Sequence, residues 1–377
     1  MTTRCTVGIP REVKDGEHRV AITPDGVHEL RAHGVDVVVE AGAGADSSIL
    51  DTDYASAGAE ILAAADDVWA RADIVMKVKE PQAEEFGRLR PGLVLFTYLH
   101  LAAYPAVADA LLEQKVTGVA YETVQDESGA LPLLAPMSEV AGRMATQIGA
   151  HFLEREYGGR GILLGGVPGV RPAHVVVLGA GNVGWNAAWI AQGMEAEVTL
   201  LDKNLDRLRF VDQIHQGRIV TLASNRGTAA RAVSEADLVV GAVLVPGGRA
   251  PVVVTKEMVA SMRPGSVIVD CAVDQGGCVE TIRETTHADP VYELDGVLHY
   301  GVGNIPAAVP HTSTYALTNT TLPYALALAT KGVADAAHAD PSLAAGVNTV
   351  GGSITNVAVA EALHHPAIRL VDALAGA

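Results

Sequence analysis

The chain has few cysteines, few aromatic residues and no excess of positive charge. Its 377 residues include only three cysteines, Cys5, Cys271 and Cys278, too few and too scattered for a disulfide framework or a closely paired zinc or redox site. We therefore expect reduced thiols in a cytoplasmic protein. The formal net charge of −17 excludes the basic surface by which proteins bind nucleic acid or an anionic membrane.

Long apolar runs and metal-ligand clusters are also missing. No stretch approaches the roughly 20 apolar residues that a transmembrane helix needs, and the start of the chain lacks the apolar region of a signal peptide. No cluster with the spacing of metal ligands is visible, so we expect no bound metal. Hydrophobic residues nevertheless make up 49% of the chain and aromatic residues only 4%, which is typical of α/β proteins with buried parallel strands.

Valine-rich runs alternate with alanine-rich segments in the first third of the chain. We expect strands at residues 5–9, 35–40, 74–78 and 93–98, and helices at 24–32, 55–65 and 103–113. Strands that alternate with helices indicate βαβ units and a parallel sheet.

A second set of apolar runs follows a long helical segment that extends from Met137 to about Glu156. We expect its strands at residues 175–178, 198–201, 218–222, 238–241, 266–270 and 297–300, and a helical tail from Thr314. A tail of this length has to pack on another part of the chain. The sequence thus predicts two Rossmann-like, doubly wound α/β domains with a cleft between them. The expected boundaries are 1–132 plus 311–377 for a substrate domain and 133–310 for a dinucleotide-binding domain.

The segment Gly179-Ala180-Gly181-Asn182-Val183-Gly184 follows one of these strands and opens a helix. In this pattern the first glycine permits a tight turn, the second lets backbone N–H groups approach a pyrophosphate, and the third allows close helix packing. Asp202 ends the next strand, 23 residues after Gly179, near the spacing of about 20 for a carboxylate that binds a ribose 2′-hydroxyl. The carboxylate repels a 2′-phosphate and favours NAD over NADP, a preference that the nearby Lys203 and Arg207 can soften.

Several polar residues follow apolar strands, where ligands of open α/β sheets bind. Lys77 and Lys79 end one strand and, by strand alternation, project to the same face. His100 follows the next strand, Arg19 precedes a helix start, and Asp274 lies beyond a strand of the second domain. These residue types suit a dehydrogenase that holds a carboxylate and moves protons near neutral pH.

Each of these residues also has a structural interpretation. Composition alone favours a surface ion pair for Arg19, and one of the two lysines is expected to be a solvated strand end. His100 is equally well read as a buried histidine bonded to backbone, and Asp274 as the cap of a glycine loop. Asp270 is better explained as structural, while Glu122 fits a cap, an ion pair or a wall of the site.

Nine segments in order along the chain carry a resemblance to a known family. They are Val7-Gly-Ile-Pro-Arg-Glu, Glu17-His-Arg-Val-Ala-Ile-Thr-Pro, Val75-Met-Lys-Val-Lys-Glu-Pro, Phe96-Thr-Tyr-Leu-His-Leu-Ala, Leu133-Leu-Ala-Pro-Met-Ser-Glu-Val-Ala-Gly-Arg, Gly165-Gly-Val-Pro-Gly-Val, Gly241-Ala-Val-Leu-Val-Pro-Gly, Ala272-Val-Asp-Gln-Gly-Gly-Cys and Asn304-Ile-Pro-Ala-Ala-Val-Pro-His-Thr-Ser-Thr. With the glycine pattern, they make the chain resemble the alanine dehydrogenases over essentially its full length. Two departures are minor: Trp185 is bulky at a helix start, and Ile305 stands where the family has methionine.

The resemblance implies NAD-dependent oxidative deamination of L-alanine to pyruvate and ammonium, in a homohexamer. By motif match, Arg19 and Lys79 hold the substrate carboxylate and polarise its carbonyl or imine. His100 is the acid/base on the substrate oxygen, and Asp274 is its partner near nitrogen and water. We expect the cofactor site to comprise Ser138, Gly179, Gly181, Asn182, Val183, Gly184, Asp202, Lys203, Arg207, Ser224, Val243, Leu244, Asp274 and Asn304.

Other functions remain open at this point. The main alternative is an NAD(H)-binding subunit of a transhydrogenase, which passes hydride to a partner protein and needs no substrate pocket. A dehydrogenase for another small 2-oxo acid, a more distant saccharopine dehydrogenase and a binding protein without turnover are further alternatives.

Overall fold

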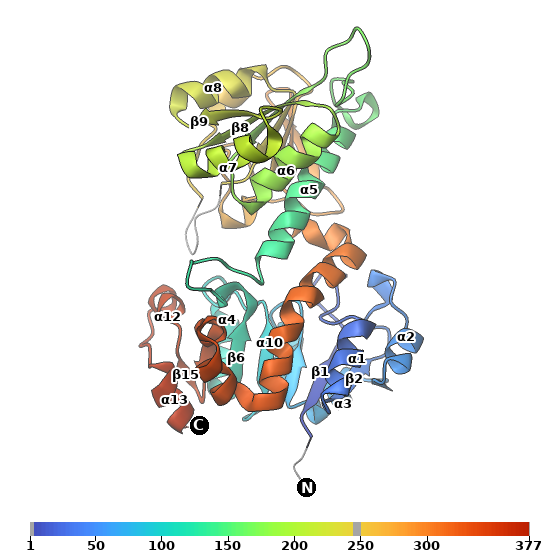
Figure 1. The fold of residues 1–377 in the computed structure, drawn as a ribbon, viewed down its shortest axis with the longest axis vertical. Helices are drawn as coiled ribbons and strands as arrows, with labels where there is room; N and C mark the ends of the chain where they lie inside the picture. The colour runs from blue at the N-terminus through green and yellow to red at the C-terminus, as the bar shows by residue number, and fades with distance from the viewer. Residues whose placement is uncertain (1–3, 244–249, 377) are drawn as a thin grey trace. The chain divides into compact units, whose positions relative to one another are not determined.

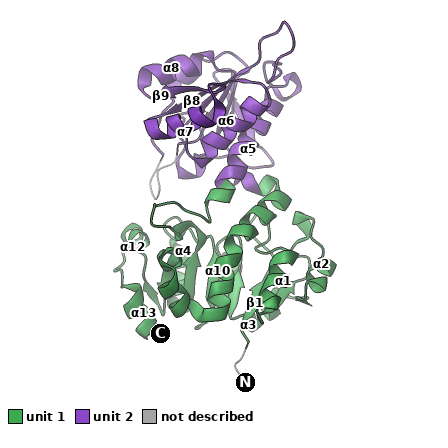
Figure 2. Cartoon of the chain, viewed as in Figure 1, with its two compact units in different colours: residues 1–137, 307–377 green, residues 138–306 purple. Residues whose placement is uncertain are grey.

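Two β-sheets organise the chain, and each belongs to its own unit (Figures 1 and 2). The computed structural model describes residues 4–243 and 250–376. Unit 1 consists of Met1–Met137 and Ala307–Ala377, and unit 2 consists of Ser138–Pro306. Unit 1 is therefore built from two separate parts of the sequence.

The elements of unit 1 alternate between strand and helix as far as residue 120. Its strands are β1 (Thr6–Ile9), β2 (Asp36–Glu40), β3 (Glu60–Leu62), β4 (Ile74–Met76), β5 (Val94–Thr97), β6 (Thr117–Ala120), β14 (Val347–Val350) and β15 (Ser353–Ile354). Its helices are α1 (Pro24–Ala32), α2 (Asp51–Ser56), α3 (Ala65–Arg71), α4 (Pro105–Glu113), α10 (Pro310–Ala339), α11 (Pro341–Gly346), α12 (Val357–Leu363) and α13 (Leu370–Gly376). The helix α5 (Ala135–Phe152) begins in this unit and continues into unit 2.

The sheet of unit 1 has the order β15-β14-β6-β5-β4-β1-β2-β3. The six strands from β3 to β6 are parallel and follow the order 3-2-1-4-5-6 of a dinucleotide-binding sheet. β14 adds to β6 in antiparallel orientation, and β15 forms a hairpin with it. The chain therefore returns from unit 2 to complete the sheet that it began.

The expected helix at residues 55–65 is wrong. That stretch contains the end of α2, a turn at Gly58 with φ +101°, and the whole of β3. Alanine-rich composition favours a helix, but the chain turns at Gly58 after α2, and residues 60–62 pair with β2. Pairing with a neighbouring strand outweighs the local helix propensity.

Unit 2 repeats the same architecture. Its strands are β7 (His174–Leu178), β8 (Glu197–Asp202), β9 (Val220–Ala223), β10 (Leu238–Gly241), β11 (Val267–Asp270), β12 (Val291–Leu294) and β13 (Val297–Tyr300). Besides the end of α5, its helices are α6 (Asn182–Gly193), α7 (Leu205–His215), α8 (Arg226–Glu235) and α9 (Lys256–Ala260). The sheet order β12-β13-β11-β10-β7-β8-β9 is again 3-2-1-4-5-6 for the parallel strands, with β12 as an antiparallel edge.

Both faces of the unit 2 sheet are buried, as a doubly wound fold requires. Along β7, Val175 and Val177 belong to one hydrophobic cluster, and Val176 and Leu178 belong to another. Alternate residues of one strand thus enter two cores on opposite sides of the sheet. This explains why the strand reads as a continuous apolar run.

Candidate active site

In each unit, most of the candidate residues lie beyond the carboxyl ends of parallel strands. In unit 1 the loop after β1 carries Arg19, the loop after β4 carries Lys79, and His100 follows β5. β1 and β4 are neighbours, and they are the strands between which the chain order reverses. Ligands of open α/β sheets bind at this kind of position.

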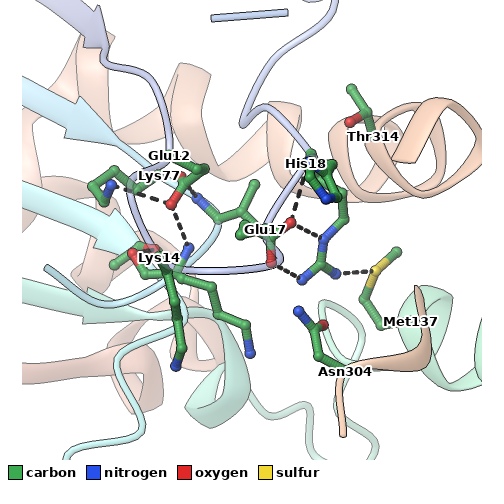
Figure 3. Close-up of polar contacts among 12 residues, drawn as sticks. Glu12, Lys14, Glu17, His18, Lys77, Met137, Asn304 and Thr314 are labelled. Carbon is green, nitrogen blue, oxygen red and sulfur yellow. Dashed lines mark hydrogen bonds and ion pairs between the residues drawn. The ribbon is translucent and has the colours of Figure 1, made fainter. Parts of the chain in front are cut away.

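Arg19 is buried in unit 1, with 2% of its surface exposed. Its Nε donates to Glu17 Oε1 at 2.7 Å, and its Nη2 donates to Glu17 Oε2 at 2.6 Å. Nη1 lies 3.0 Å from Met137 Sδ, on the other side of the guanidinium (Figure 3). Burial opposes the charge, but the Glu17 carboxylate outweighs it and raises the pKa of Arg19. The prediction from composition that Arg19 forms a surface ion pair is therefore wrong.

Lys79 is partly buried, and the charges of this pair act on it. Its carbonyl oxygen accepts a hydrogen bond from Thr97 Oγ1 at 3.0 Å, which ties the loop after β4 to the end of β5. Burial, and then the positive charge of Arg19, lower the pKa of Lys79 below that of an ordinary lysine. Two cations that influence each other in this way suit the binding of an anion.

Lys77 is not the solvated strand end that the sequence left open. It has 0% exposure, and its Nζ lies 3.1 Å from Glu12 Oε2 and 3.0 Å from Glu85 Oε1. Figure 3 shows Glu12 between the two loops, beside Lys77. The strand β4 ends at Met76, so the alternation that predicts one common face for Lys77 and Lys79 no longer applies beyond it.

His100 has a left-handed backbone conformation, with φ +46°. Its side chain is 34% exposed and stacks on Tyr98, with ring centroids 5.7 Å apart. Glu122 accepts the backbone N–H groups of both Leu99 and His100, and its Oε1 lies 3.9 Å from His100 Nδ1. Glu122 thus fixes the loop that carries the imidazole, and the imidazole is neither deeply buried nor fully solvated.

The glycine pattern of unit 2 forms a phosphate cradle between β7 and α6. A Cβ on Gly184 would lie 1.7 Å from the Gly179 carbonyl oxygen, and Gly179 itself has φ +102°. Gly181 is the N-cap of α6 and has no side chain that could cap the helix. A Cβ at this position would have room. The backbone N–H groups at this helix start therefore fit a pyrophosphate.

Asp202 ends β8 beside the cradle. Its Oδ2 accepts the N–H of Ala180 at 2.6 Å, and its Oδ1 accepts the N–H of Asn204 at 2.7 Å. Arg207 is exposed with its Nη1 4.0 Å from Asp202 Oδ2, and Lys203 is exposed next to the acid. Each carboxylate oxygen can accept a second hydrogen bond, so the acid suits a ribose hydroxyl.

Replacing Asp202 with serine is expected to shift cofactor preference towards NADPH by about 10- to 100-fold. The change removes a charge that repels a 2′-phosphate and leaves Arg207 and Lys203 to bind it, and one charged hydrogen bond is worth about 1.5–3 kcal/mol. The measurement is the ratio of kcat/KM for NADH and NADPH. Asp206→Ser is the control, because Asp206 is an exposed acid on the same turn and pairs with Arg209. An unchanged ratio would show that Asp202 does not contact the ribose of the cofactor.

Two of the remaining cofactor candidates lie directly after other strands of unit 2. Val243 follows β10, with its backbone nitrogen 3.3 Å from a Cβ built on Gly179, so it borders the cradle. The N–H of Ser224, just after β9, donates to the carbonyl oxygen of Asp202 at 2.9 Å. Asn304 has a left-handed backbone with φ +56°, while Ser138 lies within α5. Leu244 lies outside the described residues.

Asp274 lies four residues beyond β11, on the short 3₁₀ helix Val273–Gln275, and is exposed. Asp270, at the end of β11, is buried and accepts the N–H groups of Ala272 (2.9 Å), Cys278 (2.8 Å) and Val279 (3.0 Å). Asp270 therefore closes the loop that carries Asp274. The structural interpretation of Asp270 is confirmed.

Replacing Asp270 with asparagine is expected to lower the free energy of unfolding by about 1–3 kcal/mol. The new NH₂ group cannot accept from the backbone donors that one carboxylate oxygen now satisfies, so at least one buried N–H loses its partner. Urea unfolding followed by circular dichroism measures the change. Asp289→Asn, at an exposed acid in the same unit, is the control. Equal stability of wild type and D270N would show that these bonds contribute nothing.

Sequence reasoning missed several residues that shape the unit 1 site. Glu17 is the main one, although an acid two residues before Arg19 in an extended loop is a visible signal. Thr314, on α10, is another: its Oγ1 accepts the N–H of Val20 at 3.1 Å and lies 2.9 Å from Ser47 Oγ. The C-terminal part of unit 1 thus fixes the loop that carries Arg19, and no local pattern reveals such a contact.

Within residues 4–243 and 250–376, none of the helices combines the length and apolar character needed to span a membrane. In the same part of the chain, no three His, Cys, Asp or Glu side chains come together as metal ligands.

The strand orders, the cradle and the acid at the end of β8 define a Rossmann-type dinucleotide-binding fold. Family models then identify the protein class more closely. Residues 8–141 match the N-terminal domain of the alanine dehydrogenase/PNT family, and residues 145–357 match its C-terminal domain. The chain belongs to this family.

Known relatives support the same assignment. An alanine dehydrogenase of Methanococcus maripaludis is 56% identical over 357 residues, which cover 94% of this chain and 96% of the relative. A solved L-alanine dehydrogenase structure superposes with a TM-score of 0.93 at 48% identity, covering 95% of this chain and 99% of that one. A transhydrogenase from Sinorhizobium meliloti has a TM-score of 0.81 at 27% identity, covering 94% and 99%. The chain is thus more similar to the dehydrogenases than to this transhydrogenase.

Proposed function

We propose that the chain is an NAD-dependent L-alanine dehydrogenase. The reaction converts L-alanine, water and NAD⁺ into pyruvate, ammonium, NADH and a proton. Unit 1 is the substrate domain and unit 2 the NAD domain in this proposal. The relatives named alanine dehydrogenase, at 56% and 48% identity, support it.

The buried Arg19–Glu17 pair, with the partly buried Lys79, at the reversal point of the unit 1 sheet is the observation that carries the proposal. Glu17 accepts hydrogen bonds from Nε and Nη2 of the guanidinium. A substrate carboxylate would bind the Arg19 guanidinium on the side of the Met137 sulfur. Arginine binds carboxylates in this paired fashion, and its orientation here is fixed before substrate arrives.

Lys79 would act on the carbonyl oxygen of the substrate. Its ammonium stabilises negative charge that develops on the pyruvate carbonyl during reduction, because a fixed cation in a dry site is effective there. The lowered pKa of Lys79, caused by burial and by Arg19, also limits how tightly it holds its proton.

His100 and Asp274 would move the protons. In the deaminating direction, loss of hydride from Cα of alanine leaves an iminium, to which water adds, and the resulting carbinolamine loses ammonia. His100, which is partly exposed and held by Glu122, would take the proton from the oxygen as the carbonyl forms. Asp274, exposed after β11, would accept and return protons near nitrogen and water.

NAD would bind at the carboxyl edge of the unit 2 sheet. The N–H groups at the start of α6, with Gly181, Asn182 and Val183, would hold the pyrophosphate, and Asp202 would accept from the ribose. Ser138, Gly179, Gly184, Lys203, Arg207, Ser224, Val243, Leu244 and Asn304 complete the proposed site. Bound NAD⁺ supplies the hydride acceptor of the reaction.

The test is consumption of NADH by the purified chain with pyruvate and ammonium. We expect NADH to be consumed only when pyruvate and ammonium are both present. Turnover with glyoxylate or 2-oxobutyrate but not with pyruvate would indicate another 2-oxo acid dehydrogenase. Binding of NADH without turnover of any oxo acid would favour the transhydrogenase-type alternative.

We also propose a cytoplasmic homohexamer. Cys5, Cys271 and Cys278 are free thiols, which suits a reducing compartment. Unit 2 exposes apolar side chains that a subunit interface would cover, among them Leu163, Val167 and Val170. Light scattering coupled to size-exclusion chromatography tests the assembly: a mass other than that of six chains would overturn this part of the proposal.

A further inference from the structure

Two loops of unit 1 are joined by ion pairs between residues that lie far apart in the sequence. The loop after β1 supplies Glu12 and Lys14, and the segment after β4 supplies Lys77 and Glu80. Glu12 pairs with Lys77, and Lys14 donates to Glu80. Figure 3 shows Glu12, Lys14 and Lys77 together, with Glu17 farther along the same loop. We call these two pairs the charged staple.

The inner pair of the staple is fully buried, which stability alone does not explain. Lys77 has 0% exposure, and the side chain of Glu12 is 3% exposed. Removing two charges from water costs several kcal/mol, and replacing such a pair by apolar residues is often neutral or stabilising. Burial works against the Lys77 charge, but Glu12 and Glu85 outweigh it and raise the pKa of Lys77.

Glu12 makes contacts that reach the functional lysine. Its Oε1 accepts the N–H of Val78 at 2.6 Å, and its Oε2 lies 3.4 Å from the N–H of Lys79. Oε2 is also the atom that pairs with the Lys77 ammonium. One carboxylate therefore holds three consecutive residues of the segment after β4.

We propose that Glu12, held in place by Lys77, is a positioning residue that fixes the Val78–Lys79 backbone and so aims the Lys79 ammonium at the substrate. The proposal rests on the function proposed above, in which Lys79 contacts the substrate. The loop that supplies Glu12 continues to Glu17 and Arg19, so the staple also sets the spacing between the two substrate cations. Glu12 acts through Lys79 and does not touch the substrate.

The variant Glu12→Gln tests this without unfolding the protein. It leaves Lys77 paired with Glu85 at 3.0 Å, so no unpaired charge remains in the core. The new amide can still accept from Val78, but its NH₂ group meets the Lys77 ammonium and the Lys79 N–H, which are also donors. The Lys79 backbone therefore loses its fixed position.

Two readouts are expected to change in E12Q. The kcat/KM for pyruvate should fall at least about tenfold while the KM for NADH stays the same, because small misplacements of a reacting group are costly. Independently of turnover, acylation of Lys79 by acetic anhydride, followed by mass spectrometry, should begin at a higher pH than in the wild type. Burial and Arg19 lower the pKa of Lys79 in the intact site, and a displaced ammonium loses this effect.

Asp237→Asn is the matched control. Asp237 is also a buried carboxylate that pairs with a cation, Arg160 at 2.7 Å, and accepts a backbone N–H, that of His174 at 2.9 Å. It lies in unit 2 before β10, away from the carboxyl ends of the strands. D237N should leave both readouts at wild-type values, and an equal loss in D237N would overturn the proposal.

Other outcomes also separate the possibilities. Wild-type pyruvate kinetics and wild-type Lys79 acylation in E12Q would overturn the positioning role. If the wild-type chain itself does not reduce pyruvate, the proposed function fails. In that case the acylation profile of E12Q still decides whether Glu12 fixes Lys79: a shift supports the positioning role, and no shift overturns it.

Discussion

Replacing Arg19 with methionine is expected to lower kcat/KM for pyruvate by about 10²- to 10⁴-fold. Two charge-assisted hydrogen bonds to the substrate carboxylate disappear, each worth about 1.5–3 kcal/mol. The same change removes the cation that pairs with the buried Glu17 carboxylate, which costs about 3–5 kcal/mol of stability. Steady-state kinetics and urea unfolding measure the two effects separately.

The double variant Arg19→Met/Glu17→Gln distinguishes binding from folding. It removes both charges of the buried pair, so most of the lost stability should return, whereas activity with pyruvate should not. Arg71→Met is the control: Arg71 and Glu60 form the same bidentate pair at 2.6 and 2.7 Å, but in solvent, where such pairs contribute little. If the double variant recovers activity along with stability, Arg19 does not bind the substrate.

Replacing His100 with asparagine is expected to lower kcat by about 10²- to 10⁴-fold and to leave NADH affinity unchanged. Asparagine cannot exchange protons near neutral pH, and general acid/base catalysis contributes an effect of this size. It tolerates the left-handed backbone of residue 100, φ +46°, better than alanine does, so the fold is preserved. Asp274→Asn should share the phenotype. Fluorescence titration with NADH measures the affinity.

His364→Asn is the control for this prediction. His364 has the same residue type and the same kind of backbone, with φ +56°, at the exposed C-terminal end of α12. Its replacement should leave kcat unchanged. A loss of NADH affinity in H100N as large as its loss of rate would contradict the acid/base role.

The glycine turn between β7 and α6 could be predicted from the sequence because its form depends on local backbone. Gly179 and Gly184 occupy positions that only glycine fills, Gly181 begins the helix between them, and Asp202 follows at a fixed distance along the chain. The parallel strands were equally predictable, since both of their faces are buried and they read as apolar runs. Strands β12 and β14, which add antiparallel to the edges of the sheets, gave no such signal.

The residues of the unit 1 site were harder to predict from the sequence because their structure depends on distant partners. A lysine directly after a strand is typical of a solvated end, and only the folded chain brings Glu12 and Glu85 to Lys77. In the same way, the burial of Arg19 depends on Glu17, and its loop is fixed by Thr314, almost 300 residues later. The left-handed conformation of His100 also has no signature in the sequence.

Unit 2 is an uninterrupted segment inserted between the two parts of unit 1. A ribosome therefore synthesises all of unit 2 before it makes α10 and β14, which supply Thr314 and cover the β6 edge. Domains generally fold as units during synthesis. Unit 2 therefore folds first, while the sheet of unit 1 still has an unpaired edge strand. A nonsense mutation shortly after residue 306 would thus yield a chain with one finished domain and one exposed strand, a form prone to aggregation and to capture by chaperones.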